Sequence, residues 1–549
     1  MWLRIPKILW GMLLRDLWWM LALTAAVLTA IVAFAAGVRP LADGQLDPLV
    51  ALRFMALALA PMLQFTAPFA AGFAATLVYH RFATENEDLA AAAAGVSRRT
   101  VLMPAFGTGL ALALVVGGLA HFVIPTFLRS MQKLVTRDVA RVLMTSIERG
   151  ESAQFNGLAV HADRAIRGEP DPARGVTDRL FLTGVVAFDE GEDGSIRAEV
   201  AAEHAEVLLT RERLDGEPVT VVRMRLDSAV GSQAGEGLGK VGRLTIGPWI
   251  VPDPFQDSPR MYTFFGLREL RRRPEINAGV DQLRRELAGA LSVRRAERLI
   301  AGALAGEGRV ALVDPAGARL VLWADQMRRE DDRWSLAPAD ARPLTIDRTT
   351  TDGARQTLKA EDGGISITPD PAGGPAGVRL DLDTVSTSTG QDAGAPLSAH
   401  REFDDLRLAD DAGGGLYDLS SFDLIGRADR TLAEDNAAPA VRIARDALSA
   451  RIVRLDREIL GNNHERFALA SSCLLITLLG SIVALRLREG MPLHVYLWSF
   501  FPALGAVITI SGGENVVPDN EVVGLSVLWG GVGLLALYTL IEYRRLTRH

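Results

Sequence analysis

The residues of this sequence that could do chemistry gather in one polar stretch between two apolar runs. This stretch, residues 79–104, has the sequence YHRFATENEDLAAAAAGVSRRTVLMP. Thr84 and Glu87 have the S/T-x-x-E spacing of a capping box, which predicts that a helix begins at Thr84. Glu85, Glu87 and Asp88 would then lie in the first turn, where the helix dipole favours negative charge. Such a turn can recognise basic side chains on a partner protein.

The end of the same helix is also marked in the sequence. The alanines from Ala90 to Ala94 favour a helix and Gly95 offers a stop, so the predicted helix covers about residues 84–95 and is roughly 15 Å long. Ser97 is expected to cap the next helix. A short alanine-rich helix of this kind can enter a groove on a partner. A plain capped turn that connects two neighbouring helices is the alternative, and the spacing alone leaves both open.

Catalytic and metal-binding patterns are missing from the sequence. Its 8 histidines include no His-x-x-x-His pair, and there is no Gly-x-Ser-x-Gly elbow. The single Cys473 excludes an intrachain disulfide and a thiolate metal cluster. The net charge of −7 gives no overall attraction for nucleic acid. We therefore expect no catalytic residue, no metal site, no cofactor and no nucleic-acid partner.

The polar stretch must be positioned by membrane-spanning elements. Six apolar runs are long enough, or nearly so, to cross a bilayer as helices of about 20 residues. They are Leu17–Val38, Phe54–Tyr79, Val101–Ile124, Phe467–Leu485, Val495–Ile510 and Val522–Ile541. The short loops on one side carry eleven Lys and Arg residues, whereas those on the other carry only Arg39 and Arg53. By the positive-inside rule, both termini are cytoplasmic and the long middle segment lies outside the cytoplasmic membrane.

The middle segment is predicted to be mostly β-structure. Alternating apolar and polar residues, separated by Gly, Asp and Pro turns, are typical of a sandwich or jelly roll. Two pairs of similar stretches, GLAVHADRAI with ARLVLWADQM and VTVVRMRLDSAV with AGVRLDLDTVST, indicate two related β-domains in tandem. The predicted fold class is therefore a membrane α-helical protein with six transmembrane helices, three plus three, and an inserted all-β jelly-roll-like region of two tandem β-domains.

The composition shifts along the chain predict six parts. They are transmembrane helices 1–3 with the cytoplasmic helix (1–127), a jelly-roll-like β-domain (128–265), a helical connector (266–305), a second β-rich domain (306–430), a helix leading to the membrane (431–465) and transmembrane helices 4–6 (466–549).

The spans, the β-rich insert and a loop of the form R-x₅-E-x₇-G-x-S together resemble the LptF/LptG (YjgP/YjgQ) permease family of lipopolysaccharide export. Arg81, Glu87, Gly95 and Ser97 match that loop, and Pro104 matches the proline that follows it. The stretch NHERFALA at residues 463–470 is similar to the family's charged approach to its fourth span. Family members have one jelly roll, so the segment from about residue 274 to 430 has no counterpart there.

The resemblance implies a transport function. In the family, two such permeases form the transmembrane pair of an ABC transporter, and a separate ATP-binding cassette ATPase dimer grips their coupling helices. Lipopolysaccharide leaves the outer leaflet of the bacterial inner membrane and passes to a periplasmic β-jellyroll bridge protein. This chain would be one permease without its own ATPase site, with its large insert in the periplasm. The implied ATPase-docking residues are Arg81, Thr84, Glu85, Glu87, Asp88, Gly95 and Ser97.

Basic residues past the third span are candidates for contact with the substrate. Arg129, Lys133, Arg137 and Arg141 recur every four residues, so on a helix they form one slowly drifting stripe. Together with Arg39 and Arg53, they could rim the cavity mouth and bind the phosphates of lipopolysaccharide or a related glycolipid. Snorkelling to lipid headgroups, or an ordinary solvated face, is the alternative.

Two other classes of protein stay open on the sequence alone. A non-transporting membrane scaffold or mechanotransmitting protein could dock an ATPase through the same loop. A membrane-anchored enzyme with its active site in the β-region is disfavoured, because the sequence lacks the catalytic patterns. Lipid that purifies with the protein would favour transport over the scaffold.

Overall fold

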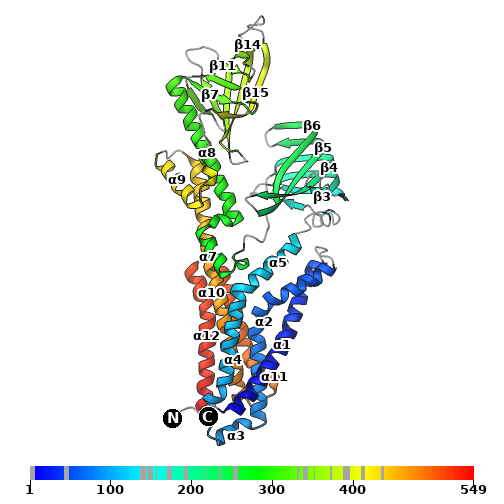
Figure 1. The fold of residues 1–549 in the computed structure, drawn as a ribbon, viewed down its shortest axis with the longest axis vertical. Coiled ribbons are helices and arrows are strands. Elements are labelled where there is room, and N and C mark those ends of the chain that lie inside the picture. The colour runs from blue at the N-terminus through cyan, green and yellow to red at the C-terminus, as the bar shows by residue number, and fades with distance from the viewer. Residues whose placement is uncertain are drawn as a thin grey trace. The chain divides into compact units, whose positions relative to one another are not determined.

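A computed structural model describes most of the chain. The described residues are 6–42, 48–136, 144, 147, 153–155, 158–169, 176–190, 196–214, 217–233, 236–251, 258–324, 326–330, 333–337, 344–351, 353–370, 374–387, 396–409, 415–434 and 438–548. They form two compact units, the first made of Met1–Arg268 with Arg457–His549 and the second of Glu269–Asp456 (Figure 1).

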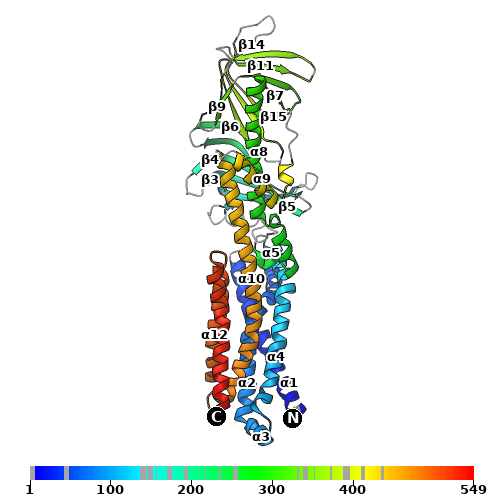
Figure 2. The same cartoon turned by 90° about the vertical axis from the view of Figure 1, so that its left-hand side faces the viewer.

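The first unit contains the long apolar helices. Its helical elements are α1 (Lys7–Ala42), α2 (Pro48–Thr84), α3 (Glu87–Ala93), α4 (Arg98–Gly118), the π-helical turn η1 (Leu119–Val123), α5 (Ile124–Thr136), η3 (Pro259–Met261), α11 (Pro492–Val516) and α12 (Glu521–Arg548). Two helices, α7 (Phe264–Arg272) and α10 (Pro439–Arg486), run from one unit into the other. The start of α1, the end of α12 and the short α3 lie at the same end of the helical bundle (Figures 1 and 2).

Six candidate membrane spans are present among the described helices, which confirms that number. They are Lys7–Val38, Leu52–Thr84, Arg98–Met131, Pro439–Arg486, Pro492–Val516 and Glu521–Arg548. The third of them extends past residue 127, where the predicted first part ends, because η1 and α5 continue α4 without a break.

Glycines let some of these helices approach closely. A Cβ at Gly480 of α10 would lie 2.7 Å from the carbonyl oxygen of Gly72 in α2, and a Cβ at Gly513 of α11 would lie 2.6 Å from the backbone nitrogen of Leu528 in α12. Small residues allow such backbone contact between membrane helices, where the hydrophobic effect gives little drive for association. The α2–α10 and α11–α12 pairs therefore depend on these positions.

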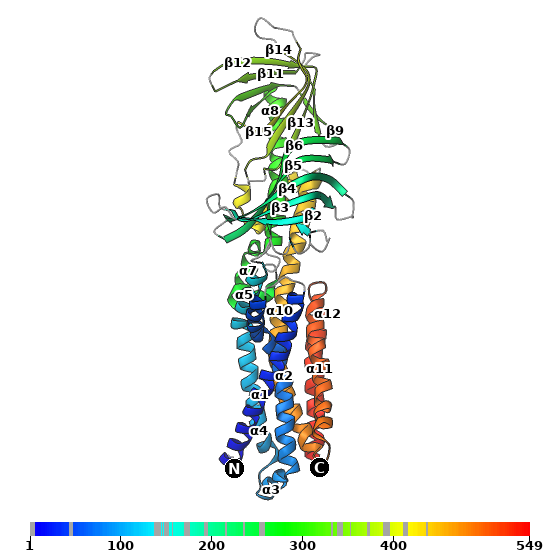
Figure 3. The ribbon, with the colours of Figure 1, turned by 90° about the vertical axis from the view of Figure 1, so that its right-hand side faces the viewer.

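The first unit also holds an open antiparallel sheet. Its strands are β1 (Ala153–Phe155), β2 (Leu158–Gly168), β3 (Val176–Glu190), β4 (Ile196–Leu214), β5 (Glu217–Gln233) and β6 (Glu236–Val251). Each strand pairs with its neighbour in the chain, so the described strands form a six-stranded meander (Figure 3). Alternate residues such as Leu180, Leu182 and Leu226 are buried on one face. The jelly roll is not confirmed, because the described strands have no crossover in their order.

The second unit holds a larger sheet and several helices. Its helical elements are η4 (Pro274–Ile276), α8 (Ala278–Glu307), η6 (Leu416–Asp418) and α9 (Ser421–Glu434). Its strands are β7 (Arg309–Val313), β8 (Arg319–Trp323), β9 (Gln326–Glu330), β10 (Arg333–Ala337), β11 (Leu344–Thr349), β12 (Arg355–Ala360), β13 (Asp362–Thr368), β14 (Gly377–Thr387) and β15 (Pro396–Leu408).

The strands of the second unit close on themselves. They pair in the order β12-β11-β8-β7-β15-β14-β13-β10-β9, and β12 also pairs with β14. Six strands therefore form a ring around a core that includes Leu320, Ile346 and Leu380. Ile300 and Leu304 of α8 pack into the same core. Because one sheet is an open meander and the other closes into a ring, the predicted tandem relation of two like domains is not confirmed.

Candidate functional site

The predicted capping box is wrong. Thr84 is the last residue of α2, and its hydroxyl donates to the carbonyl oxygen of Arg81 at 3.0 Å. The helix α3 begins three residues later, and its N-cap is Asn86, in the left-handed region with φ of 59° and without a side-chain capping bond. Asparagine tolerates that conformation better than most residues. Thr84 cannot cap α3 because the preceding helix already uses its side chain.

The exit from α3 follows the prediction. Gly95 has a φ of 81°, the left-handed conformation that favours glycine, and its N–H donates to the carbonyl oxygen of Ala92 at 2.9 Å. Ser97 is the N-cap of α4, and its hydroxyl accepts from the backbone N–H of Thr100 at 3.3 Å. Gly95 as the stop and Ser97 as the cap are therefore confirmed as structure, and their role in docking stays a prediction.

The surface of α3 is largely unpartnered. None of its seven residues is buried, and the apolar side chain of Leu89 is about half exposed. Arg81 forms an ion pair with Glu85, with 2.9 Å between Nε and Oε1. Within the described part of the chain, Glu87 and Asp88 form no ion pair. The helix therefore carries two half-buried acidic residues beside an exposed apolar side chain, and Glu87 is close enough to Arg81 for the two charges to attract.

Three membrane helices anchor the start of α4. Trp10 of α1 donates its indole N–H to the carbonyl oxygen of Thr100 at 3.0 Å. Tyr79 of α2 donates its hydroxyl hydrogen to the carbonyl oxygen of Val101 at 2.9 Å. From α4, Arg98 donates to the carbonyl oxygen of Leu546 in α12. Arg99 Nε donates to the hydroxyl of Tyr543 in α12 at 3.1 Å. These bonds join the start of α4 to α1, α2 and α12.

A buried ion-pair network links two more helix ends. The Glu542 side chain of α12 is only 1% exposed; its Oε2 lies 2.8 Å from Nη1 of Arg486 in α10, and its Oε1 lies 3.1 Å from Nη1 of Arg545. The sequence did not predict this network, and Arg486 and Arg545 count there only among the basic residues that indicate orientation. An acidic residue at the end of an apolar run, followed by basic residues, was the available signal.

The NHERFALA stretch forms a second polar network. Glu465 accepts from the hydroxyl of Ser511 at 3.2 Å, and Arg466 Nη2 donates to the carbonyl oxygens of Arg260 and Tyr262 at 3.1 Å each. Arg260 also pairs with Glu514, with 2.6 Å between Nη2 and Oε2. Burial by itself lowers the pKa of Arg260, but the charges of Glu514 and Glu465 outweigh it and raise that pKa. These contacts fasten η3 to α10 and α11.

The described part of the structure does not bring the basic residues predicted to contact the substrate together into one site. Arg39 lies in α1 and Lys133 in α5, but their side chains are outside what the structure describes, as is the whole of Arg137. Arg53 is exposed on α2. Arg129 is exposed on α5, with its guanidinium 5.0 Å from the ring centre of Tyr262.

The helices that carry these basic residues do meet. Ala33 of α1, Ala58 of α2 and Met131 of α5 share one buried cluster. Phe54 and Leu128, which are the neighbours of Arg53 and Arg129 in the chain, pack against that cluster. The described part of the chain therefore brings the three helices together, and contact of their basic side chains with a substrate stays a prediction.

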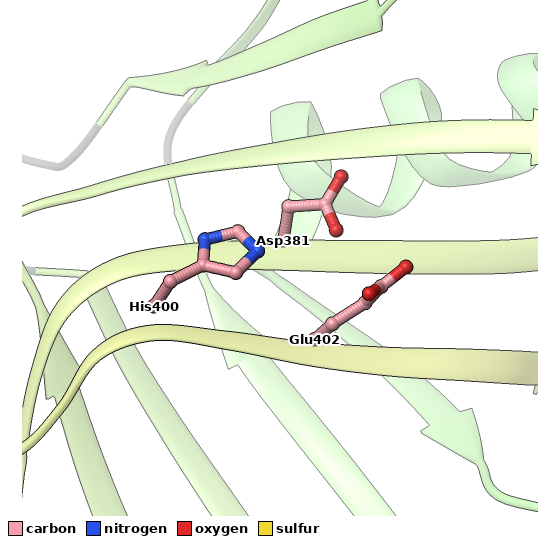
Figure 4. Close-up of side chains that lie close together, drawn as sticks. All are labelled: Asp381, His400 and Glu402. Carbon is pink, nitrogen blue, oxygen red and sulfur yellow. The ribbon is translucent and has the colours of Figure 1, made fainter. Parts of the chain in front are cut away.

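One group of possible metal ligands lies in the second unit. Asp381 of β14 and His400 and Glu402 of β15 have ligand atoms within 4.8 Å of one another (Figure 4). His400 Nδ1 lies 2.8 Å from Oδ1 of Asp383, and this hydrogen bond raises the pKa of His400. Glu402 pairs with Arg379 at 3.0 Å. Because two of the three groups already have charged partners, we assign a cross-strand charge ladder here.

Comparison with known proteins identifies the first part of the chain. Residues 11–221 match the family model described as lipopolysaccharide export system permease LptF/LptG. Over these residues, the chain belongs to the LptF/LptG permease family. The match covers α1 to α5 and the sheet as far as β5, whereas the second unit and α11 and α12 lie beyond it. No curated protein matches the chain.

Permeases of the LptF/LptG family are transport components and not enzymes. The family and the six candidate spans together indicate a multi-pass protein of the inner membrane. The loop that contains α3 lies inside the matched residues. It is therefore part of the permease and not of the additional second unit.

Proposed function

We propose that this chain is the transmembrane permease subunit of an ABC transporter that extracts lipopolysaccharide or a related glycolipid from the inner membrane and passes it to a periplasmic bridge protein. The family match over residues 11–221 is the observation that carries this proposal. A second permease of the same family would supply the other half of the cavity. Both termini would be cytoplasmic, and both sheets would lie in the periplasm.

The coupling helix in this proposal is α3. An ATP-binding cassette ATPase dimer would receive the exposed face of α3, with Glu87 and Asp88 paired to basic side chains of the ATPase. Arg81 and Glu85 would hold the loop before α3, and Gly95 and Ser97 would fix its exit into α4. Thr84 would contribute by closing α2 and not by capping α3.

Transmission would follow the hydrogen bonds at the start of α4. The Trp10 and Tyr79 bonds tie this point to α1 and α2, so closure of the ATPases would move these helices with α4. Such a rigid-body transition needs contacts that differ between the two nucleotide states. The bundle would narrow and displace the glycolipid, whose phosphates would meet Arg39, Arg53, Arg129, Lys133 and Arg137 at the cavity mouth.

Replacing Glu87 by Lys tests the proposal. The charge lies at the start of an exposed helix, so the change costs the fold at most about 1 kcal/mol. It sets like charges against each other in the docked complex, and we expect loss of the ATPase that otherwise purifies with the permease. Glu489→Lys is the matched control, because Glu489 is an exposed acidic residue outside α3.

The readouts are the amount of ATPase in a pull-down and the lipid in the purified complex, identified by mass spectrometry. If the Glu87→Lys protein retains as much ATPase as the Glu489→Lys protein does, α3 is a plain connecting turn. Retention of the wild-type ATPase without any glycolipid would favour the scaffold over the exporter.

A further inference from the structure

Four phenylalanine side chains form an exposed apolar patch where α7 meets two of the membrane helices. They are between 42% and 69% exposed and come from η1 (Phe122), α7 (Phe264 and Phe265) and α10 (Phe467). The ring centre of His121 lies 4.7 Å from that of Phe467 and 5.8 Å from that of Phe264. The ring centres of Phe122 and Phe265 lie 6.2 Å apart. Exposed apolar patches mark surfaces that contact a membrane or another molecule.

The place of this phenylalanine patch along the helices puts it at one boundary of the bilayer. The helix α4 has 21 residues and is therefore about 30 Å long, which is the thickness of the hydrocarbon core. Because η1 follows α4 directly, Phe122 lies at the end of this span that is remote from α3. Val115, about two turns earlier on α4, is also 52% exposed. The patch thus continues the exposed apolar surface of a membrane span.

The helix α7 has one buried and one exposed face. It has nine residues, too few to cross a bilayer. Leu267 and Leu270 are buried. Phe265, Arg268 and Arg272 are exposed, and their spacing of three and four residues places them on one helix face. This face changes from aromatic to basic along its length, as in helices that lie in the membrane interface with their apolar side chains in the acyl region.

Two of the arginines at the end of α7 are available to an anion. Arg271 pairs with Asp456, with 2.6 Å between Nε and Oδ1, and Arg273 lies within 4.0 Å of two carboxylates. In the part of the chain that the structure describes, no carboxylate lies within ion-pair distance of Arg268 or Arg272. Both follow the phenylalanines of α7 by one or two turns, which is the step from acyl chains to headgroups.

We propose that α7 and the phenylalanine patch bind an anionic phospholipid of the leaflet at this end of the bundle. The acyl chains cover Phe122 and Phe265, and the phosphate accepts hydrogen bonds from Arg268 and Arg272. A guanidinium offers a planar fork of N–H donors that suits phosphate oxygens. Positive charges next to a leaflet favour anionic over zwitterionic lipid. This surface depends only on the membrane spans and not on the proposed export function.

Spin labelling tests the apolar half of the proposal. Cys473, the only cysteine of the chain, is buried, so the full-length Phe265→Cys protein can be labelled selectively. It is reconstituted in vesicles of phosphatidylcholine and phosphatidylglycerol. Phe422→Cys is the matched control, because Phe422 is 52% exposed on α9, which is not a membrane span.

We expect the label at position 265 to collide more with oxygen, which concentrates in lipid, than with a water-soluble nickel complex. The label at position 422 should show the reverse. A label at position 265 that the nickel complex reaches freely overturns the proposal. Shielding of that label from both reagents also overturns it, because a protein segment would then cover the patch.

Titration with phosphatidylglycerol tests the charged half. Native mass spectrometry of the full-length protein in a neutral detergent measures its tightest binding step, with phosphatidylcholine as the blank. The test protein combines Arg268→Gln with Arg272→Gln. The control combines Arg427→Gln with Arg430→Gln, which removes two exposed charges from α9.

Each basic residue near an anionic lipid surface strengthens binding about fivefold, so the test protein should bind phosphatidylglycerol roughly 25-fold more weakly than wild type. The control should stay near wild type, and phosphatidylcholine should bind the test protein and wild type alike. An equal loss in the two double variants overturns the proposal. An equal loss for the two lipids does so as well, because the arginines would then not recognise the anionic headgroup.

Discussion

The network around Glu542 allows the fold of the helical bundle to be tested quantitatively. We consider Glu542→Gln, which keeps the shape of the side chain and removes its charge. The carboxylate is 1% exposed and lies between Arg486 and Arg545, so the change leaves Arg486 without its counter-charge. Breaking one partner of a buried ion pair costs about 3–5 kcal/mol.

The loss of folding free energy in Glu542→Gln should fall at the lower end of that range. Arg486 keeps 23% of its side chain exposed, so water can replace part of the lost interaction. Glutamine also still accepts a hydrogen bond. We therefore expect a loss of about 3 kcal/mol, which corresponds to a fall in the melting temperature of roughly 4 °C for a unit of this size.

Thermal unfolding of the detergent-solubilised protein, followed by tryptophan fluorescence, measures this change. The matched control is Glu521→Gln in the first turn of the same helix, where an exposed acidic residue is worth about 0.3–1 kcal/mol. The double variant Glu542→Met with Arg486→Met should recover most of the loss, because it removes both charges together. A Glu542→Gln protein that melts within a degree of the control would refute the burial of this ion pair.

Three further predictions follow from single contacts. Gly480→Ala places a Cβ 2.7 Å from the Gly72 carbonyl oxygen and should cost about 1–3 kcal/mol in the melting assay, whereas Gly530→Ala, with open space around its Cβ, should not. Ser97→Ala removes the cap of α4 and should cost about 1 kcal/mol, seen as faster hydrogen exchange in its first turn, and unchanged exchange would contradict the cap. His400 has a pKa raised above 6.5, so its pair with Asp383 should stabilise the second unit below about pH 6.5 and lose this effect as the pH rises through the folded-state pKa. This pH-dependent stabilisation is measured by comparing the unfolding of His400→Asn with that of wild type at pH 5.5 and pH 8.5. If the difference in stability between the two proteins is the same at both pH values, the pair is contradicted.

Local features of this protein could be predicted from its sequence. The six candidate spans follow from the length and apolarity of individual runs, because a helix in lipid satisfies its own backbone hydrogen bonds. The roles of Gly95 as a helix stop and Ser97 as a helix cap were also predictable, because each depends on only a few neighbouring residues. The Thr84 box failed because the preceding helix continues to that residue, and the spacing of side chains does not define where that helix ends.

The long-range pairings were decided only by the tertiary structure. The strand β15 comes last in its sheet along the chain but pairs with both β7 and β14. The Glu542–Arg486 pair and the phenylalanine patch of η1, α7 and α10 depend on helices that are far apart in sequence. The sequence by itself determined the six apolar spans and the predominance of strands in the middle segment, but not every helix there, since α9 (Ser421–Glu434) begins inside the part predicted to be β-rich. Only the fold decided which distant charges meet, because such contacts depend on closing long loops and on packing, and neither is encoded in neighbouring residues.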